Sequence, residues 1–434
     1  MATSNVSIRS NSVPPGGTTA INATPPTQTS PELQALIDEL TPVVTKFRQN
    51  SSPQNTQLNQ STVNVGGQDI IRISSVGIGT MTYRHHHLVI NLTNNATTAQ
   101  TVNLSPTFPY DFISSTEIGI NVGSKTYSAS GPAGLYVIGR VHRGSLRAVN
   151  NGLDPAICTV SFGSNLTPTA SSGFTLSGYD SVSVAASSSG TITADFITVE
   201  KMVYTLDSMI GGLPLQNNSV FATLTTTAVS TLIGSDVTTP LFVAGGPPST
   251  LTGTGVDTID SEYDYWGVPS DPALFAAMVT NSYQVLEQKG GSTNSTGQGA
   301  ITYDIPQNEL LIALHLTAIQ GASGSKTFLT PSQIQQIKVQ YNGGKVVPVE
   351  EYYFRQRAKQ YLAYGYDAQQ LPGYRMWDGD DTSDQINNTD SAGWLDAYTA
   401  ASPQFVADLA SSVTTPVNYS ITRESIGQGQ VQVI

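Results

Sequence analysis

Short runs of β-branched and aromatic residues, separated by Gly, Asn and Pro, recur along this chain from about residue 61 onward. Runs of this kind are typical of strands bounded by turns. The first set lies at 70–73, 87–92, 136–141, 157–160, 174–176, 181–184, 191–197 and 220–225, and a second at 282–286, 300–305, 310–316 and 337–341. Many short strands with turn signals between them predict an all-β protein made of sandwiches or jelly rolls.

The two sets of runs divide the 434 residues into two units, which agrees with the usual size of a domain. We expect one sandwich at 61–267, a second at 268–426 and a C-terminal tail at 427–434. Residues 234–258 are rich in Gly, Thr and Pro, and they predict a long exposed loop that forms a tower or a clasp between subunits. Both units contribute to the predicted core, with Val89, Ile138, Phe196, Leu224, Ile312, Leu314 and Phe405.

The start of the chain departs from this β pattern. Residues 1–29 lack the apolar content of a core and predict a flexible arm. We interpret 30–60 as an amphipathic helix and a linker, because Ser30-Pro31-Glu32 has the features of a helix N-terminus. Apolar residues then recur at three- and four-residue steps, although Pro42 should kink the helix: Leu33, Leu36, Ile37, Leu40, Val43, Val44 and Phe47. A second, shorter helix is predicted at 348–363, inserted in the second sandwich.

Few residues of this chain are charged. Charged side chains make up 12% of the sequence, against about 25% in a typical soluble protein. A polar but largely neutral surface suits close packing against copies of itself, because amides and hydroxyls pair at an interface without the cost of burying charge. The formal net charge is −12 and neither end carries a basic cluster, so we expect no direct binding to nucleic acid.

A single cysteine, Cys158, excludes a disulfide within the chain. With no signal segment and no apolar stretch long enough to span a bilayer, this predicts assembly in the reducing cytoplasm of a host. Cys158 itself lies in an apolar run, and we expect it to be a small buried side chain.

The run His85-His86-His87 lies in a predicted strand. Adjacent side chains of a strand alternate between faces, so only His85 and His87 share a side, and a third ligand is not evident. We therefore expect solvated or interface-packed histidines, and we assign no metal and no cofactor. The acidic segment 378–384 lacks the terminal glutamate of an EF-hand loop and predicts a solvated turn.

Carboxylates and aromatic residues also alternate between residues 257 and 266: Asp257, Asp260, Glu262, Tyr263, Asp264, Tyr265 and Trp266. Paired carboxylates on an aromatic platform occur in glycoside hydrolases and sugar-binding modules. An edge strand or a seam between domains explains the same alternation, and we favour that interpretation. No nucleophile elbow, phosphate loop or dinucleotide-binding pattern occurs in a suitable context, so we predict no catalytic residues and no enzyme activity.

Four features occur in an order that can be compared with a known family. They are the leading helix, the strand and polar turn at 88–97, the segment 211–218 before the strand at 220–225, and the basic helix at 348–363 followed by 371–375. This order resembles the double jelly-roll major capsid proteins of tailless, membrane-containing icosahedral phages of the tectivirus type. The resemblance covers most of the chain from about residue 30.

The resemblance implies two jelly rolls side by side, and three chains that form a pseudo-hexagonal capsomer of an icosahedral virion shell. It also implies that the N-terminal helix lies inside the shell, near an internal lipid membrane. The apolar stripe of that helix is too short to span a bilayer, and only Lys46 and Arg48 flank it with positive charge. Docking of the stripe on a neighbouring subunit is therefore at least as well supported as docking on lipid.

The sequence thus predicts a structural major capsid protein that self-assembles through homotrimers. Its expected partners are other copies of itself, penton or minor capsid proteins, and a membrane beneath the shell. Two alternatives stay open: the capsid protein of a small RNA virus, which usually brings a basic arm to its genome, and an extracellular carbohydrate-binding or adhesive β-sandwich protein.

Overall fold

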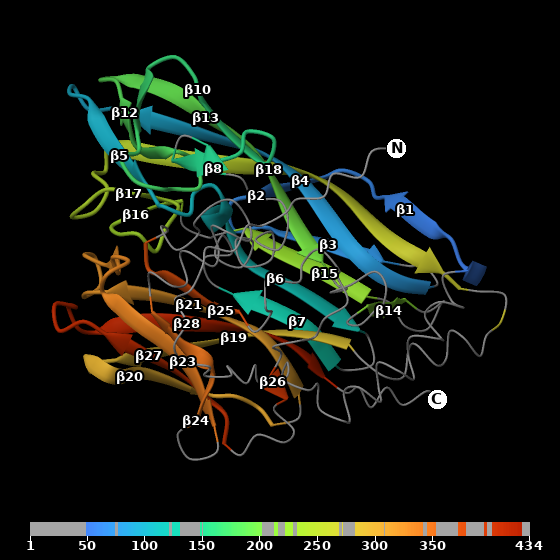
Figure 1. Ribbon diagram of the computed structural model, residues 1–434. Coiled ribbons are helices and arrows are strands. Elements are labelled where there is room, and N and C mark those ends of the chain that lie inside the picture. Colours follow the sequence, from blue (N-terminus) through green and yellow to red (C-terminus); the bar gives the residue numbers. More distant parts are fainter. Residues whose placement is uncertain are drawn as a thin grey trace, which may run out of the picture.

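The structure is a computed structural model, and it describes residues 49–73, 77–120, 124–130, 148–149, 151–201, 212–215, 222–228, 232–268, 271, 283–307, 309–341, 345–352, 372–378, 395–396 and 402–427. Two stacked β-sandwiches make up the described part (Figure 1). The helix and arm predicted at 1–48, the run at 136–141 and the acidic turn beyond Asp378 lie outside the described residues.

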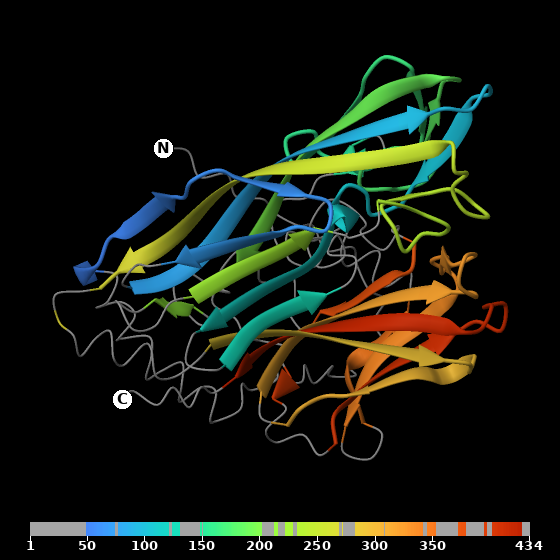
Figure 2. The ribbon, with the colours of Figure 1, turned by 180° about the vertical axis from the view of Figure 1, so that it is seen from behind.

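The first sandwich has a seven-stranded sheet as its outer layer. Its order is β1 (Pro53–Gln57), β18 (Leu251–Gly267), β4 (Gly77–Asn94), β13 (Ser188–Lys201) and β10 (Cys158–Phe162), with β2 (Ser61–Asn64) on β18 and β14 (Leu213–Leu215) on β4. The long strands β18, β4 and β13 run side by side in both views (Figures 1 and 2).

A five-stranded sheet packs against one part of this layer. Its order is β11 (Leu166–Ala170), β12 (Tyr179–Val184), β5 (Gln100–Leu104), β17 (Leu241–Phe242) and β16 (Ile233–Gly234). A short 3₁₀ helix, η1 (Tyr110–Phe112), follows β5, and the small hairpin of β8 (Ala148–Val149) and β9 (Gly152–Leu153) precedes β10.

A ten-stranded sheet joins the two sandwiches. Its order is β22 (Thr327–Phe328), β21 (Glu309–Gln320), β28 (Val417–Gly427), β19 (Tyr283–Thr293), β7 (Ser124–Ser130), β6 (Ile113–Ile120), β15 (Ala222–Ala228) and β3 (Gln68–Ile73), with β25 (Tyr374–Asp378) and β26 (Leu395–Asp396) on β21. The junction is the parallel pair of β19 and β7, where Leu286 lies opposite Tyr127. The predicted units are therefore continuous through one sheet.

The second sandwich is closed by a four-stranded sheet with the order β20 (Gly297–Asp304), β27 (Gln404–Leu409), β23 (Ile334–Tyr341) and β24 (Lys345–Tyr352). Its inner side chains, such as Ile301, Val339 and Phe405, pack on Leu314 and Ile421 of the ten-stranded sheet. This apolar layer is separate from the core of the first sandwich, in which Leu88, Ile192 and Val182 are fully buried.

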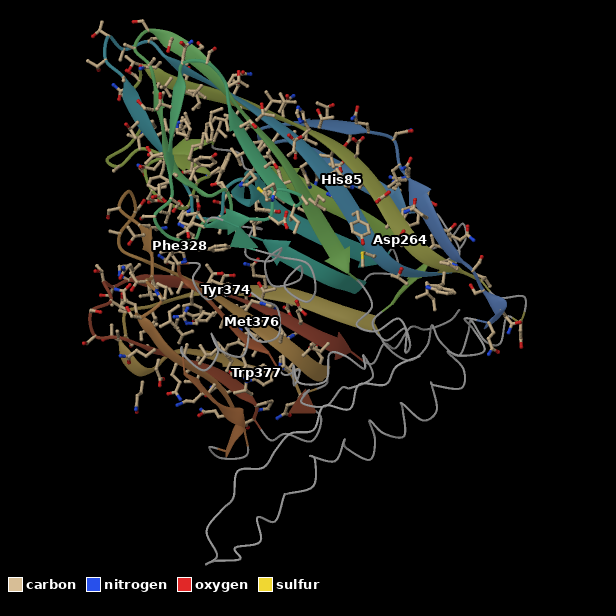
Figure 3. All side chains as sticks on the ribbon, turned by 45° about the horizontal axis from the view of Figure 1, so that its top comes forward. His85, Asp264, Phe328, Tyr374, Met376 and Trp377 are labelled. Atoms are coloured by element: carbon tan, nitrogen blue, oxygen red, sulfur yellow. The ribbon has the colours of Figure 1, made fainter. Side chains whose placement is uncertain are left out.

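One strand contributes to both cores. Along β25, Tyr374 and Met376 pack into the first core, whereas Trp377 packs into the second (Figure 3). A small apolar cluster of Val237, Ile319 and Phe328 adds a second contact between the sandwiches. Beside it, the amide of Gly324 donates a hydrogen bond of 2.9 Å to the carboxylate of Asp236.

The predicted core is confirmed at Phe196, Ile312, Leu314 and Phe405, which are all buried. The prediction that Val89 is a core residue is wrong, because β4 turns its even-numbered residues inward here and leaves Val89 half-buried on the outer face. The side chain of Leu224 and the whole of Ile138 lie outside the described residues.

The prediction of a helix starting at residue 348 is also wrong for residues 348–352. Residues 348–352 are part of β24, which pairs with β23. Local helix propensity is overridden because Val346 and Val347 suit a strand and find a partner there. Pro348 is tolerated because β24 is an edge strand and the pairing with β23 is irregular near it. Residues 353–363 lie outside the described part.

The predicted loop at 234–258 is shorter in the structure. It contains β17, and from Leu251 onward it is β18 rather than loop. Along 251–256 exposed Thr residues alternate with more buried Gly residues, and the Gly and Thr content hid this strand pattern. Two further differences are that β1 lies in the predicted linker and that Phe174 and Leu176 are buried in a loop rather than a strand.

Candidate functional site

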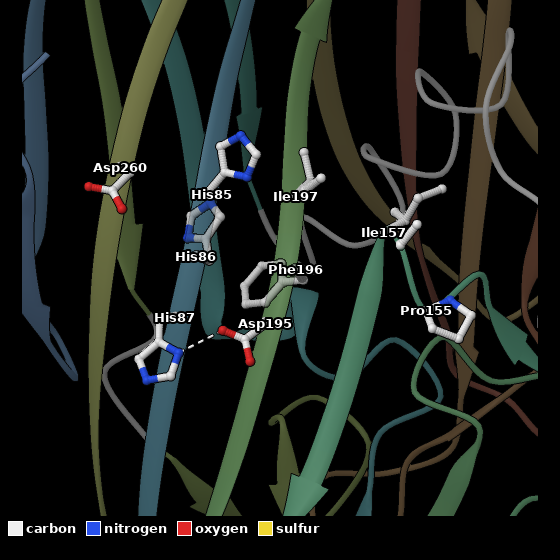
Figure 4. A pocket seen from close by; sticks show the side chains of 10 residues that line it. His85, His86, His87, Pro155, Ile157, Asp195, Phe196, Ile197 and Asp260 are labelled. Carbon is white, nitrogen blue, oxygen red and sulfur yellow. Dashed lines mark hydrogen bonds and ion pairs between the residues drawn. The ribbon is translucent and has the colours of Figure 1, made fainter. Parts of the chain in front are cut away.

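The histidine run lies on β4, in the middle of the seven-stranded sheet. As predicted, His85 and His87 share the exposed face of the sheet, whereas His86 points inward and is buried. A pocket of about 260 Å³ opens here (Figure 4). Its lining comes from β4, β13, β18 and the segment before β10: His85, His86, His87, Pro155, Ala156, Ile157, Asp195, Phe196, Ile197 and Asp260.

Each exposed histidine of this pocket has a carboxylate on a neighbouring strand. Asp195 of β13 lies opposite His87, and Asp260 of β18 lies opposite His85. The Nδ1 atom of His87 is 2.6 Å from Oδ1 of Asp195. Both of these side chains are more than half exposed, at 52% and 61%, so the contact contributes little to stability. The pocket can bind a polar group at the surface, with Pro155 and Ile157 as an apolar wall.

His86 forms a structural contact inside the first sandwich. Its Nδ1 lies 2.7 Å from Asp257 Oδ2, its Nε2 lies 3.0 Å from the hydroxyl of Thr198, and its ring stacks on Phe196 with centroids 4.5 Å apart. Both ring nitrogens are therefore occupied by protein atoms. Among the residues that the structure describes, no group of three or more His, Cys, Asp or Glu side chains is arranged to hold a metal ion.

The acidic and aromatic residues of β18 are divided between two faces. Asp257 and Tyr263 point inward and are buried, whereas Asp260, Glu262 and Asp264 lie on the opposite face. Burial raises the pKa of Tyr83 on β4, and the nearby carboxylates of Asp264 and Glu262 raise it further. Asp257 thus does not share a face with the other three acids, and the five side chains do not form one catalytic group.

The aromatic residues of β18 do not form an exposed platform. Tyr263 is buried, and Tyr265, two residues further along the strand and so on the same face, packs against the first core with its ring 5.5 Å from that of Tyr263. The prediction that this segment is an edge strand is wrong, because β18 pairs with β4 on one side and with β1 and β2 on the other.

Three other sequence-based expectations concern single positions or segments. Cys158 is buried as predicted, and burial raises the pKa of its thiol to about 12. The apolar stripe of the predicted N-terminal helix (Leu33, Leu36, Ile37, Leu40, Val43, Val44 and Phe47) lies outside the described residues, and so does most of the acidic segment 378–384. No helix within the described ranges is both long and apolar enough to cross a membrane.

A buried polar network in the second sandwich was not predicted. Arg423 of β28 donates to Tyr303 at 2.9 Å, to Glu287 at 2.8 Å and to Glu309 at 3.0 Å, and the hydroxyl of Ser425 donates to Glu309. Arg423 is only 3% exposed. The signal in the sequence is the pair Arg423-Glu424 inside a strand-like run, because charges in such a run must be paired when both faces are covered.

The opposite face of β28 carries a second polar contact. His315 of β21 lies 3.1 Å from Glu424 and 2.9 Å from the hydroxyl of Tyr374, and all three side chains are buried. Because Tyr374 belongs to the first core, this contact lies where the two sandwiches meet. Its partners are fully contained in the fold, which indicates a structural role.

A third buried group is Asp111 of η1. The hydroxyl of Thr107 donates to its Oδ1, and Oδ2 has no hydrogen-bond partner. Burial raises the pKa of Asp111 to about 6, although hydrogen bonds from Ser105 and Thr107 act in the opposite direction. Its neighbours Tyr110 and Phe112 pack in the first core, and Asp111 does not line the exposed pocket.

No protein-family model matches the chain, and no curated protein matches it. Solved structures do. The crystal structure of the STIV MCP matches with a TM-score of 0.55 at 14% identity, over 88% of this chain and 100% of that chain. The atomic structure of Sulfolobus Turreted Icosahedral Virus matches with a TM-score of 0.54 at 13% identity, over 87% of this chain and 91% of that chain.

The crystal structure of the major capsid protein P2 from Bacteriophage PM2 matches with a TM-score of 0.46 at 9% identity, over 88% of this chain and 99% of that chain. With sequence identities of 14% and 13%, the matches to the STIV MCP and to Sulfolobus Turreted Icosahedral Virus establish a shared fold and nothing more. The chain has the double jelly-roll fold, as the resemblance predicted.

Proposed function

We propose that this chain is a structural major capsid protein that self-associates into the shell of an icosahedral virion. The observation that carries this proposal is the match to the STIV MCP, because it spans 88% of this chain and the whole of that one. A match of that extent includes both sandwiches and the sheet that joins them. A shared fold alone does not fix function, so the surface must also suit assembly.

The described surface is consistent with a subunit that packs through polar contacts. Among the described residues, only Ile70 and Val268 are large hydrophobic side chains classed as exposed. Charged residues are also few, at 12% of the sequence. Interfaces between such surfaces would be built from amides, hydroxyls and ordered water, which pair without a large desolvation cost.

A trimer is the capsomer that this fold suits best. Each chain supplies two sandwiches, so three chains supply six, and six similar units around one axis give a pseudo-hexagonal tile. We further propose penton or minor capsid proteins as additional partners, with assembly in the host cytoplasm and no direct contact with nucleic acid. The rigid link between sandwiches, made by the β19–β7 pair and by β25, would keep the outline of each tile constant.

The apolar stripe from Leu33 to Phe47 is proposed as an assembly or membrane-facing helix on the inner side of the shell. Seven apolar residues at helical spacing must be covered, either by a neighbouring subunit or by a lipid membrane beneath the shell. The chain starts its described part at residue 49 and enters the outer sheet through β1 at Pro53.

An enzymatic or glycan-binding role has less support. Two His–carboxylate pairs, His86 with Asp257 and His315 with Glu424, are buried and have structural partners. A third, His87 with Asp195, is a solvent-exposed pair to which no further catalytic group is assigned among the described residues. The aromatic residues Tyr263 and Tyr265 pack inward instead of forming a platform for sugars. We therefore propose no catalytic residues.

Light scattering of the purified protein tests this function. We expect a species of three chains of 45.9 kDa, about 138 kDa, at low concentration, and larger particles as concentration rises. A variant lacking residues 1–48 keeps every described strand, so its comparison with the full-length protein shows whether association depends on the proposed N-terminal helix. A monomer at all concentrations in the full-length protein would contradict the proposal.

A further inference from the structure

A column of buried polar side chains runs along the inner face of β4. Thr82, Arg84 and His86 are alternate residues of the strand and are no more than 2% exposed. Arg84 lies opposite Thr198 of β13 and opposite Ser261 of β18, and both of these are buried as well. The first sandwich is thus apolar around Leu88, Ile90 and Leu92, and polar at its other end.

Arg84 is the main feature of this polar end. Its side chain is fully buried, and its nearest charged partner is Asp69 of β3, with Nη1 of Arg84 3.7 Å from Oδ2 of Asp69. That distance is too long for a hydrogen bond. Nε, Nη1 and Nη2 all lack a hydrogen-bond partner within the protein. A guanidinium presents five N–H donors, and burying them without acceptors is strongly unfavourable.

Other polar atoms around this column also lack partners. The atoms without a hydrogen-bond partner are Oδ2 of Asp69, Oδ1 of Asp257 and the hydroxyl of Thr82. Asp257 belongs to the same group, because its Oδ2 contacts His86 at 2.7 Å. Unused donors and unused acceptors are therefore buried on β3, β4 and β18, and the carboxylate of Asp69 lies 3.7 Å from the guanidinium of Arg84.

The occupant that satisfies both kinds of atom must donate and accept hydrogen bonds. An anion would accept from Arg84 but would be repelled by the carboxylate of Asp69. A metal cation would be repelled by Arg84. Water accepts from the guanidinium and donates to the carboxylates, and buried waters typically make about three hydrogen bonds each to otherwise unsatisfied groups.

We propose that the first sandwich contains a site for ordered internal water between β3, β4 and β18, anchored by the guanidinium of Arg84. The unused donors of Arg84 and the free carboxylate oxygens have the hydrogen-bonding capacity for about two or three water molecules. The waters would connect Arg84 of the seven-stranded sheet to Asp69 of the ten-stranded sheet, so that the ion pair is bridged by solvent as well as direct. This site does not depend on the proposed capsid function.

The test is an experimental structure of the full-length protein, as trimers or shells, in a map fine enough to resolve ordered water. We expect at least two separate peaks within hydrogen-bond distance of the Arg84 nitrogens, with one or more also in contact with Asp69 or Asp257. A dry site, with Arg84 and Asp69 in direct bidentate contact and no peaks, would overturn the proposal.

Crystals soaked in bromide distinguish water from an anion. We expect no anomalous bromide peak beside Arg84, and a bromide peak there would refute the water site in favour of an anion site. The structure of Arg84→Met should lose the peaks while other internal waters remain. If Arg84→Met does not fold, the double variant Arg84→Met with Asp69→Leu removes both charges and serves the same purpose.

Arg375→Met is the matched control. Arg375 is equally buried, but its guanidinium donates to the main-chain carbonyl of Tyr374 at 2.8 Å and reaches that of Ile334 at 3.4 Å. Its replacement should leave the peaks beside Arg84 unchanged. Peaks that persist in Arg84→Met would show that Arg84 does not anchor them, which contradicts the proposal.

Discussion

Asp111 should make the first sandwich less stable as the pH rises from 4 to 7. Its pKa in the folded protein is about 6, against an ordinary value of 3.8. A group whose pKa is raised by folding contributes stability that is fully present below its unfolded pKa and is lost as the pH rises through its folded pKa. A difference of roughly 2 pKa units corresponds to about 3 kcal/mol of unfolding free energy.

The substitution Asp111→Asn removes this titration while keeping an oxygen to accept the hydrogen bond from Thr107. The new amide group takes the place of Oδ2, which has no partner, so it costs about 1–3 kcal/mol at every pH. The informative quantity is therefore the slope with pH and not the absolute stability of the variant. The unfolding free energy of the wild type should fall by about 2.4 kcal/mol relative to the variant between pH 4 and pH 7, because the unfolded carboxyl is already partly ionised at pH 4.

Urea unfolding, followed by circular dichroism at several pH values in both proteins, measures this difference. Titrations of all other groups cancel when one curve is subtracted from the other. Asp304→Asn is a control, because Asp304 is exposed and accepts only from Gln404 in the described contacts. A wild-type minus Asp111→Asn difference that stays flat across this pH range would refute the role of burial at Asp111.

Three further outcomes are expected. Arg423→Met leaves Glu309 buried without its cation, and it should lower the unfolding free energy by about 3–5 kcal/mol in urea titrations; a loss below about 1 kcal/mol would contradict this. Burial raises the pKa of Cys158 to about 12, so iodoacetamide should modify this thiol only after unfolding, and rapid labelling of the native protein would show that it is accessible. Burial raises the pKa of Asp236, but hydrogen bonds from Thr238, Gly324 and Lys326 together lower it more, so the net pKa of the folded carboxyl is lowered. Asp236→Asn should therefore lower the unfolding free energy by about 1–2 kcal/mol at pH 7, and by progressively less as the pH falls through the folded pKa. A loss of stability that does not change with pH would contradict this.

Strand positions were predictable wherever one side of a run is polar. Alternation in β4 separates His85 and His87 from His86, and the sequence alone showed this. The phase was misjudged at Val89, where apolar residues occupy both faces of the strand. The odd-numbered polar residues His85, His87 and Asn91 give the correct phase, because they mark the exposed face.

Long-range pairing was not predictable from local patterns. The partner of His86 is Asp257, 171 residues away, and nothing near either residue indicates the contact. In the same way, β7 and β19 join the two sandwiches although more than 150 residues separate Tyr127 from Leu286. At Pro348, pairing with β23 outweighed local helix propensity. These contacts depend on the order of strands in the sheets, which side-chain periodicity does not encode.

Electron microscopy of the concentrated, purified protein is the decisive measurement for a shell-forming subunit. We expect particles with three-fold symmetry and a pseudo-hexagonal outline, and sheets or closed shells built from the same tile. Uniform single-chain particles, in conditions that keep the protein folded and concentrated, would contradict the assignment of this chain as a major capsid protein.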